Sequence, residues 1–81
     1  MNKLKIETYG QILEGNPKNW YVYIHDDAEN TGGYLILISA SLEPTDPRGF
    51  DDWVENFQGL QDYFHTKQWQ IQWLEGNSSK T

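Results

Sequence analysis

The chain contains no cysteine, so a disulfide framework, a thiolate zinc site and a cysteine nucleophile are all excluded. Basic residues are also scarce, with six Lys and Arg against twelve Asp and Glu. Between residues 26 and 62, nine acids stand against a single base, Arg48. Because phosphate contacts need clustered Lys and Arg, this distribution argues against a nucleic-acid partner and is compatible with a basic protein partner.

Long apolar runs are missing as well. The longest run, residues 34–38, is far too short to span a bilayer, and residues 1–10 hold no apolar stretch of signal-peptide length. The absence of cysteine fits a reducing compartment. We therefore expect a soluble, cytoplasmic protein that has no membrane partner.

Aromatic residues, in contrast, are abundant. The 81 residues leave room for one domain with one core, and twelve of them are aromatic. Each large aromatic side chain buries roughly 150–250 Å², so a few of them can close a small core. The sequence predicts a single domain over residues 1–75 and a disordered polar tail over residues 76–81.

Hydrophobic periodicity predicts four strands. Residues 3–9, 20–25 and 69–74 alternate between apolar and polar positions, which is typical of strands buried on one face. Residues 34–39 are continuously apolar, which indicates a strand inside the sheet and covered on both faces. Covering the second face takes more than one helix, so a partner subunit is one candidate for that cover.

Residues 50–65 carry apolar side chains at helical spacing and predict one amphipathic helix. Asp52 and Glu55 have the spacing of a capping box at its start.

The expected fold is a small α+β domain of order β-β-β-α-β, one mostly antiparallel sheet with the helix packed on one face. We expect the fourth strand to run parallel to the third through a right-handed crossover. Whether it pairs beside the third strand or the first stays open.

Candidate binding residues lie on the second strand and in two acidic loops. Tyr21, Tyr23 and His25 share one face of the strand over residues 20–25 and predict an aromatic contact patch. The alternative is that they are ordinary surface residues that cover their cross-strand neighbours. Acids that can attract a basic partner occupy the loops on either side of the third strand: Asp26, Asp27, Glu29, Glu43 and Asp46.

No catalytic, metal-binding or cofactor-binding motif is present in the sequence. The acidic loop after His25 fails the calcium pattern, because Ile38 stands where the closing Glu is needed. His25 and His65 are the only candidate general bases, and neither has a nucleophile motif or a glycine-rich phosphate loop beside it. We therefore predict no catalytic residues, no metal and no cofactor.

Three stretches of the chain, GGYLILIS, GFDDWVEN and WQIQW, resemble small bacterial proteins of the immunity-protein kind found beside polymorphic toxins. The resemblance covers residues 20–74. It implies a cytoplasmic antitoxin that binds a basic toxin domain and occludes its active site without catalysis. It carries over no site residues.

Three functional hypotheses follow from the sequence. The first is a non-enzymatic module that binds a basic protein, in the manner of an immunity protein. The second is a self-associating domain in which a homodimer completes the core around residues 34–38. The third, and the weakest, is an enzyme that uses His25 or His65.

Overall fold

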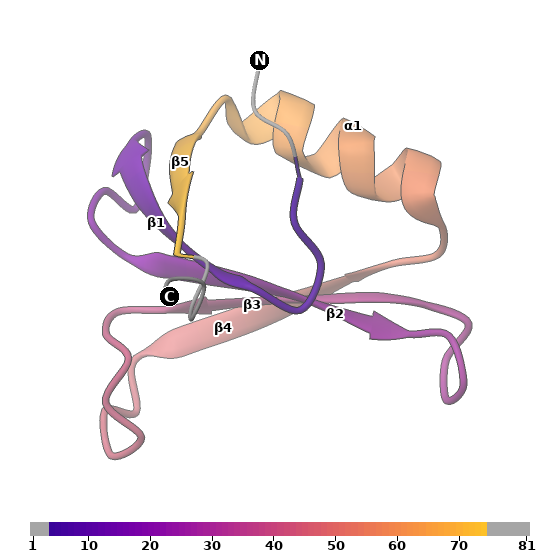
Figure 1. Cartoon of the computed structure of the whole chain (residues 1–81), viewed down its shortest axis with the longest axis horizontal. Coiled ribbons are helices and arrows are strands. Elements are labelled where there is room, and N and C mark those ends of the chain that lie inside the picture. Colours follow the sequence, from indigo (N-terminus) through magenta and orange to yellow (C-terminus); the bar gives the residue numbers. More distant parts are fainter. Residues whose placement is uncertain (1–3, 75–81) are drawn as a thin grey trace, which may run out of the picture.

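The computed structural model describes residues 4–74, which form one sheet and one helix. The elements are β1 (Tyr9–Glu14), β2 (Tyr21–Asp27), β3 (Gly33–Ser39), β4 (Gly49–Val54), α1 (Phe57–Lys67) and β5 (Gln70–Trp73). The sheet order is β4-β3-β2-β1-β5, and every neighbouring pair is antiparallel. The helix lies over one face of the sheet, where it contacts β3 and β4 (Figure 1). The predicted α+β class is confirmed, while the predicted tail over residues 76–81 lies outside the described residues.

The strands predicted over residues 20–25, 34–39 and 69–74 are present as β2, β3 and β5. β3 lies between β2 and β4, so its predicted place inside the sheet is confirmed. One of its faces is buried against the core, whereas Leu35 and Leu37 on the other face are only half-buried.

Residues 49–54 form a strand, and the prediction that the helix begins at residue 50 was wrong. β4 pairs with β3 along its whole length, from Ser39↔Gly49 to Tyr34↔Val54. The apolar residues at this point fit helical spacing by coincidence. Pairing with β3 is favoured over a helical conformation because it satisfies the backbone groups on the outer edge of β3, which would otherwise lack partners. The element order is therefore β-β-β-β-α-β.

The helix begins at Phe57 and is capped by Asn56, whose side-chain oxygen accepts a hydrogen bond from the Gly59 N–H at 2.8 Å. The predicted capping box of Asp52 and Glu55 is therefore wrong, since Asp52 belongs to β4. The helix ends at Lys67, and the sequence predicts an end between His65 and Lys67.

The first strand lies later in the chain than predicted. β1 spans Tyr9–Glu14 rather than residues 3–9, because Glu7 has a φ of 58° and interrupts the extended backbone. Leu4 and Ile6 nevertheless pack against the core. Their alternation with polar residues reflects this packing and not a strand.

The last strand pairs with the first, which answers the question that the sequence left open. β5 runs antiparallel to β1, through pairs that include Gly10↔Trp73 and Ile12↔Ile71. The predicted parallel crossover to β3 is wrong, because α1 carries the chain across the sheet from β4 to the opposite edge before β5 begins (Figure 1).

The core lies between the sheet and α1. The buried apolar side chains are Ile12, Val22, Ile24, Ile36, Ile38, Leu60, Phe64, Trp69 and Ile71. The pairs Val22↔Ile38 and Ile24↔Ile36 place four of them on one face of the two central strands. Neighbouring residues on these strands therefore point to the opposite face.

Candidate functional site

The face of the sheet turned away from α1 has no covering layer among residues 4–74 (Figure 1). We call it the open face. Because side chains alternate along a strand, the residues between the buried positions belong to it. They are Tyr9 and Gln11 on β1, Tyr21, Tyr23, His25 and Asp27 on β2, Leu35, Leu37 and Ser39 on β3, and Asp51 and Trp53 on β4.

Aromatic and aliphatic side chains form the centre of the open face. Tyr9 and Tyr23 are cross-strand partners, and their ring centroids lie 4.6 Å apart. Tyr23 is also paired with Leu37 on the next strand. The predicted aromatic patch of Tyr21, Tyr23 and His25 thus lies on one face, and Tyr9 enlarges it. Sequence reasoning missed Tyr9 because it placed that residue at the end of the wrong strand.

Trp53 extends the open face to β4, although its spacing suggested a place in the helix. Its side chain is 45% exposed, and its Nε1 donates a hydrogen bond to the Thr31 Oγ1 at 2.7 Å. Gly33 makes room for the ring, because a Cβ there would lie 2.7 Å from the Trp53 Cζ2. Trp53 is therefore an exposed aromatic residue held in one orientation by the β2–β3 loop.

The carboxylate of Glu7 ties the N-terminal segment to β2, where it accepts hydrogen bonds from three residues. Its carboxylate accepts from the Tyr23 hydroxyl at 2.7 Å, from the Asp26 backbone N–H at 2.8 Å and from the His25 Nδ1 at 2.9 Å. The His25 Nε2 lies 3.5 Å from the Asp27 Oδ1. His25 is therefore held between two carboxylates. The sequence separates Glu7 from β2 by more than ten residues, so no local pattern signals this contact.

The charges in this group shift one another's protonation equilibria. The hydrogen bond from the Asp26 backbone, followed by that from Tyr23, lowers the pKa of Glu7. The hydrogen bond to Glu7 raises the pKa of His25 above 6.5 and that of Tyr23 above 10.0. The carboxylate of Glu7 thus stabilises the protonated form of the His25 ring.

An NMR titration of the His25 ring tests this arrangement. In the native protein we expect the pKa of His25 to lie above 6.5, and in Glu7→Gln to return toward it because the charged acceptor is lost. Equal His25 curves in both proteins would contradict the Glu7 contact.

The same shifts predict how this pair affects stability with pH. The contribution of Glu7 is present above its ordinary pKa of 4.5 and is lost as the pH falls through its lowered folded value. The contribution of His25 is present below its ordinary pKa of 6.5 and is lost as the pH rises through its raised value. The pair therefore stabilises the fold most between these two ordinary values.

The acids proposed from the sequence lie at opposite ends of the sheet. Asp26, Asp27 and Glu29 are at the β2–β3 turn, while Glu43 and Asp46 are in the loop between β3 and β4. Figure 1 shows both loops bending to the side of the sheet away from α1. The acids therefore flank the open face at its two ends and do not form one cluster.

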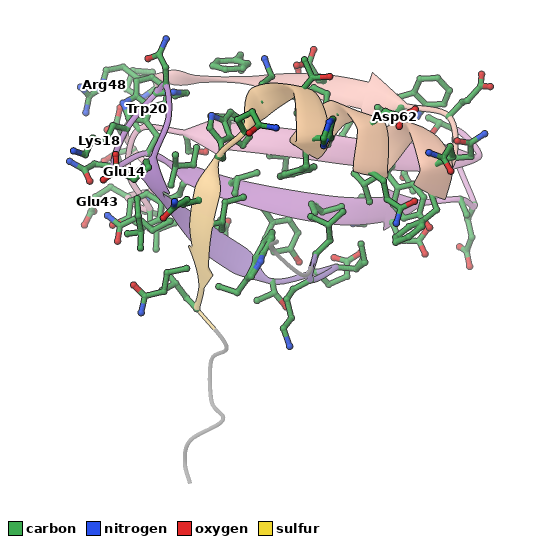
Figure 2. All side chains as sticks on the ribbon, turned by 90° about the horizontal axis from the view of Figure 1, so that it is seen from above. Glu14, Lys18, Trp20, Glu43, Arg48 and Asp62 are labelled. Carbon is green, nitrogen blue, oxygen red and sulfur yellow. The ribbon has the colours of Figure 1, made fainter. Side chains whose placement is uncertain are left out.

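The end that carries Glu43 and Asp46 has mixed charge. Asp46 accepts hydrogen bonds from the Arg48 Nη2 at 2.8 Å and from the Ser41 hydroxyl at 2.9 Å, and Arg48 holds the pKa of this carboxyl well below its usual range. Lys18 lies 3.9 Å from Glu14. Figure 2 shows Glu14, Lys18, Glu43 and Arg48 gathered at this end. Asp46 thus stabilises the loop in which it lies.

A second group of acids lies along β4 and just after it. Asp51, Asp52 and Glu55 are all exposed. Asp52 accepts a hydrogen bond from the Tyr63 hydroxyl at 2.7 Å. Burial of the Tyr63 ring, followed by this hydrogen bond, raises the pKa of Tyr63. Sequence reasoning assigned these acids to the start of the helix, so the position of Asp51 and Asp52 on an edge strand was missed.

The surroundings of the candidate metal ligands and of His25 are defined within the described residues. Within residues 4–74, no group of three or more His, Asp or Glu side chains is arranged to hold a metal ion. Both ring nitrogens of His25 face carboxylates, which orients the ring without placing it beside a described nucleophile. No helix in this part of the chain has the length and apolar character needed to cross a membrane.

Comparisons of the chain with protein-family models, with curated proteins and with solved structures found no match. Function is therefore inferred from the described residues themselves. Their most distinctive feature is the open face, with its aromatic centre and its acidic surroundings.

Proposed function

We propose that this domain is a non-enzymatic protein-binding module whose open face covers a basic protein partner in the cytoplasm. The observation that carries the proposal is the uncovered row of aromatic and aliphatic side chains across four strands. Contiguous apolar patches larger than a few hundred Å² are rare on monomeric soluble proteins, and they often mark an interaction site. A partner that covers this face would bury them.

The residue types on the open face suit a binding surface. Tyr and Trp are enriched among the residues that dominate binding energy, because each offers a large rigid area and a polar group at one end. Tyr23 and Trp53 are already fixed by hydrogen bonds to Glu7 and Thr31. Little side-chain entropy would then be lost on binding.

The charge of the domain favours a basic partner. The net charge is −6, and acids flank the open face at both ends. Opposite charge raises the rate of encounter and disfavours acidic competitors. The more negative end is the β2–β3 turn, because Asp46 at the other end is paired with Arg48.

The resemblance to immunity proteins gives this proposal a specific form. A basic toxin domain would be the partner, and the open face would occlude its active site. Such inhibition needs contact area and charge complementarity on the surface of the inhibitor, without a catalytic group. The gene next to the one that encodes this protein would then encode a toxin.

A second copy of the chain is the alternative occupant. An uncovered apolar face favours self-association, and two open faces placed together would bury it. The same arrangement would bring the acids of both copies close to one another, which opposes a homodimer. A stable dimer in sedimentation velocity at about 100 μM would therefore replace the proposed partner with a second copy.

Affinity capture from the native cell with matched variants tests the proposal. We expect the native domain to capture a basic protein that Leu37→Lys fails to capture, because the new charge repels a basic surface at the centre of the open face. Binding should then be reproduced between the two purified proteins, with at least about a tenfold weaker affinity for the variant.

Gln61→Lys is the control, since Gln61 is exposed on α1 and its substitution changes the net charge by the same amount. It should capture the partner as the native protein does. If Leu37→Lys and Gln61→Lys capture the same proteins in the same amounts, the open face is not the binding surface.

A further inference from the structure

The sheet has two edge strands, and they differ in the length of backbone available for pairing. β5 has only four residues, which limits the backbone available for pairing. β4 has six residues and pairs only with β3 among the described elements. Figure 2, viewed onto the helix side, shows β4 along one margin of the sheet with α1 set inward from it. The outer edge of β4 is therefore accessible in this view.

The register identifies which backbone groups lie on that edge. The Ala40 N–H donates to the Arg48 carbonyl at 3.2 Å, so this pair is hydrogen-bonded. Hydrogen-bonded and non-hydrogen-bonded pairs alternate along an antiparallel ladder. Phe50 and Asp52 therefore direct their N–H and C=O groups toward β3, while Gly49, Asp51 and Trp53 direct theirs outward.

Exposed aromatic side chains flank this edge on both faces of the sheet. Phe50 and Phe57 are 49% and 46% exposed, and Trp53 is exposed on the open face. The ring of Phe50 lies 6.5 Å from that of Trp20, and that of Phe57 lies 6.1 Å from that of Tyr34, measured between centroids. Side chains of an added strand would find apolar contacts on each face.

We propose that the edge of β4 accepts an extended basic segment of the partner as a sixth, antiparallel strand. This inference rests on the proposed function in taking the partner to be a basic protein. Strand addition uses main-chain hydrogen bonds for affinity and alternate side chains for specificity. Two adjacent basic residues of the segment would lie opposite Asp51 and Asp52, which point to opposite faces.

The negative charge of β4 favours a basic segment over a second copy of β4 at this edge. Asp51 and Asp52 are exposed, and neither forms an ion pair with a base among residues 4–74. Two β4 strands placed edge to edge would bring four carboxylates together, and like charges across strands are destabilising. Lys and Arg opposite the same positions would be stabilising.

A short peptide with matched backbone modifications tests the proposal directly. The probe is the blocked peptide Val-Thr-Arg-Lys-Val-Thr, which in antiparallel register sets Arg against Asp52 and Lys against Asp51. Hydrogen exchange followed by NMR at millimolar peptide should show the amides of Asp51 and Trp53 exchanging about tenfold more slowly, because they gain acceptors. The amide of Asp52 already faces β3 and should change little.

N-methylation distinguishes strand addition from simple charge attraction. Methyl groups on the second and fourth residues of the peptide remove the donors that face β4, and we expect the protection to vanish. Methyl groups on the third and fifth residues lie on the outer side, so protection should remain. Equal protection by both peptides, or none by the unmodified peptide, would overturn the proposal.

Two substitutions of Asp51 distinguish the contribution of its backbone N–H to peptide binding from that of its side-chain charge. Asp51→Pro removes an outward N–H, which an edge strand tolerates, and should abolish protection of the Trp53 amide. Asp51→Asn keeps the N–H and should weaken peptide binding only a few-fold. Native-like amide protection in β3 reports that each variant is folded. If Asp51→Pro binds the peptide as well as the native domain, β4 is not the site.

The same variants separate this inference from the proposed function. In the capture experiment, loss of the partner with Leu37→Lys and retention with Asp51→Pro would overturn strand addition and leave the open face as the binding surface. Loss with Asp51→Pro, while Asp51→Asn and Leu37→Lys both retain the partner, would leave strand addition and overturn the open face. Both substitutions are expected to reduce capture.

Discussion

Trp69→Ala should lower the free energy of unfolding by about 3–5 kcal/mol, among the largest losses expected from truncating one side chain to Ala. Trp69 is 5% exposed, and its ring packs against those of Phe64 and Tyr63 at centroid distances of 5.7 Å and 6.2 Å. Its Nε1 also donates to the Asn16 carbonyl at 2.9 Å, which ties the loop after β1 to the core. Urea denaturation measures the loss.

Trp53→Ala is the matched control, because the same atoms are removed from an exposed site. Trp53 is 45% exposed, and its loss removes one hydrogen bond to Thr31 and part of a surface contact. We expect a cost of about 1 kcal/mol or less, as for most surface substitutions. Equal losses at the two positions would mean that Trp53 is buried and that the open face is covered.

The two tryptophans also mark where sequence reasoning succeeds and where it does not. Trp69 alternates with Ile71 and Trp73, and this period of two predicted a strand with one buried face. Trp69 and Ile71 are indeed buried. Trp53 stands three residues after Phe50, which fits a helix, and the sequence of β4, GFDDWV, does not alternate between apolar and polar positions. Pairing with β3 makes it a strand, and no local pattern reveals that pairing.

The site residues divide in the same way. Tyr21, Tyr23 and His25 share a face because alternation along one strand requires it. Glu7 and Tyr9 contact these residues only because β2 folds back antiparallel to the preceding segment of the chain. The contact also depends on the positive φ of Glu7, which interrupts the extended backbone there. No pattern within the first ten residues reveals it. The residues that complete the site are therefore those brought by long-range pairing.

The acids show a related limit. Their number predicts a basic partner, but charge counts carry no information on position. The structure places Asp46 in an ion pair with Arg48 and leaves Asp51 and Asp52 on an edge strand. A carboxylate beside an unpaired backbone edge discourages self-association and favours a basic strand. The sequence assigned the same two residues to the start of a helix.

Ile36→Lys should abolish folding, whereas Leu37→Lys should leave the domain folded. Ile36 is fully buried between the sheet and α1, where an ammonium group would lose its hydration without a partner. A chain of this length has roughly 4–12 kcal/mol of stability in total, and this single change is expected to consume most or all of it. Circular dichroism and urea denaturation measure the result.

Leu37 follows Ile36 on the same strand and points to the open face, where it is only half-buried. Its replacement by Lys should cost about 1 kcal/mol, because the aliphatic stem can cover Tyr23 while the charge remains in water. Unfolding of Leu37→Lys would contradict an open face. A folded Leu37→Lys, in contrast, means that its expected failure to capture a basic partner arises at the surface, since neither the core nor α1 has changed.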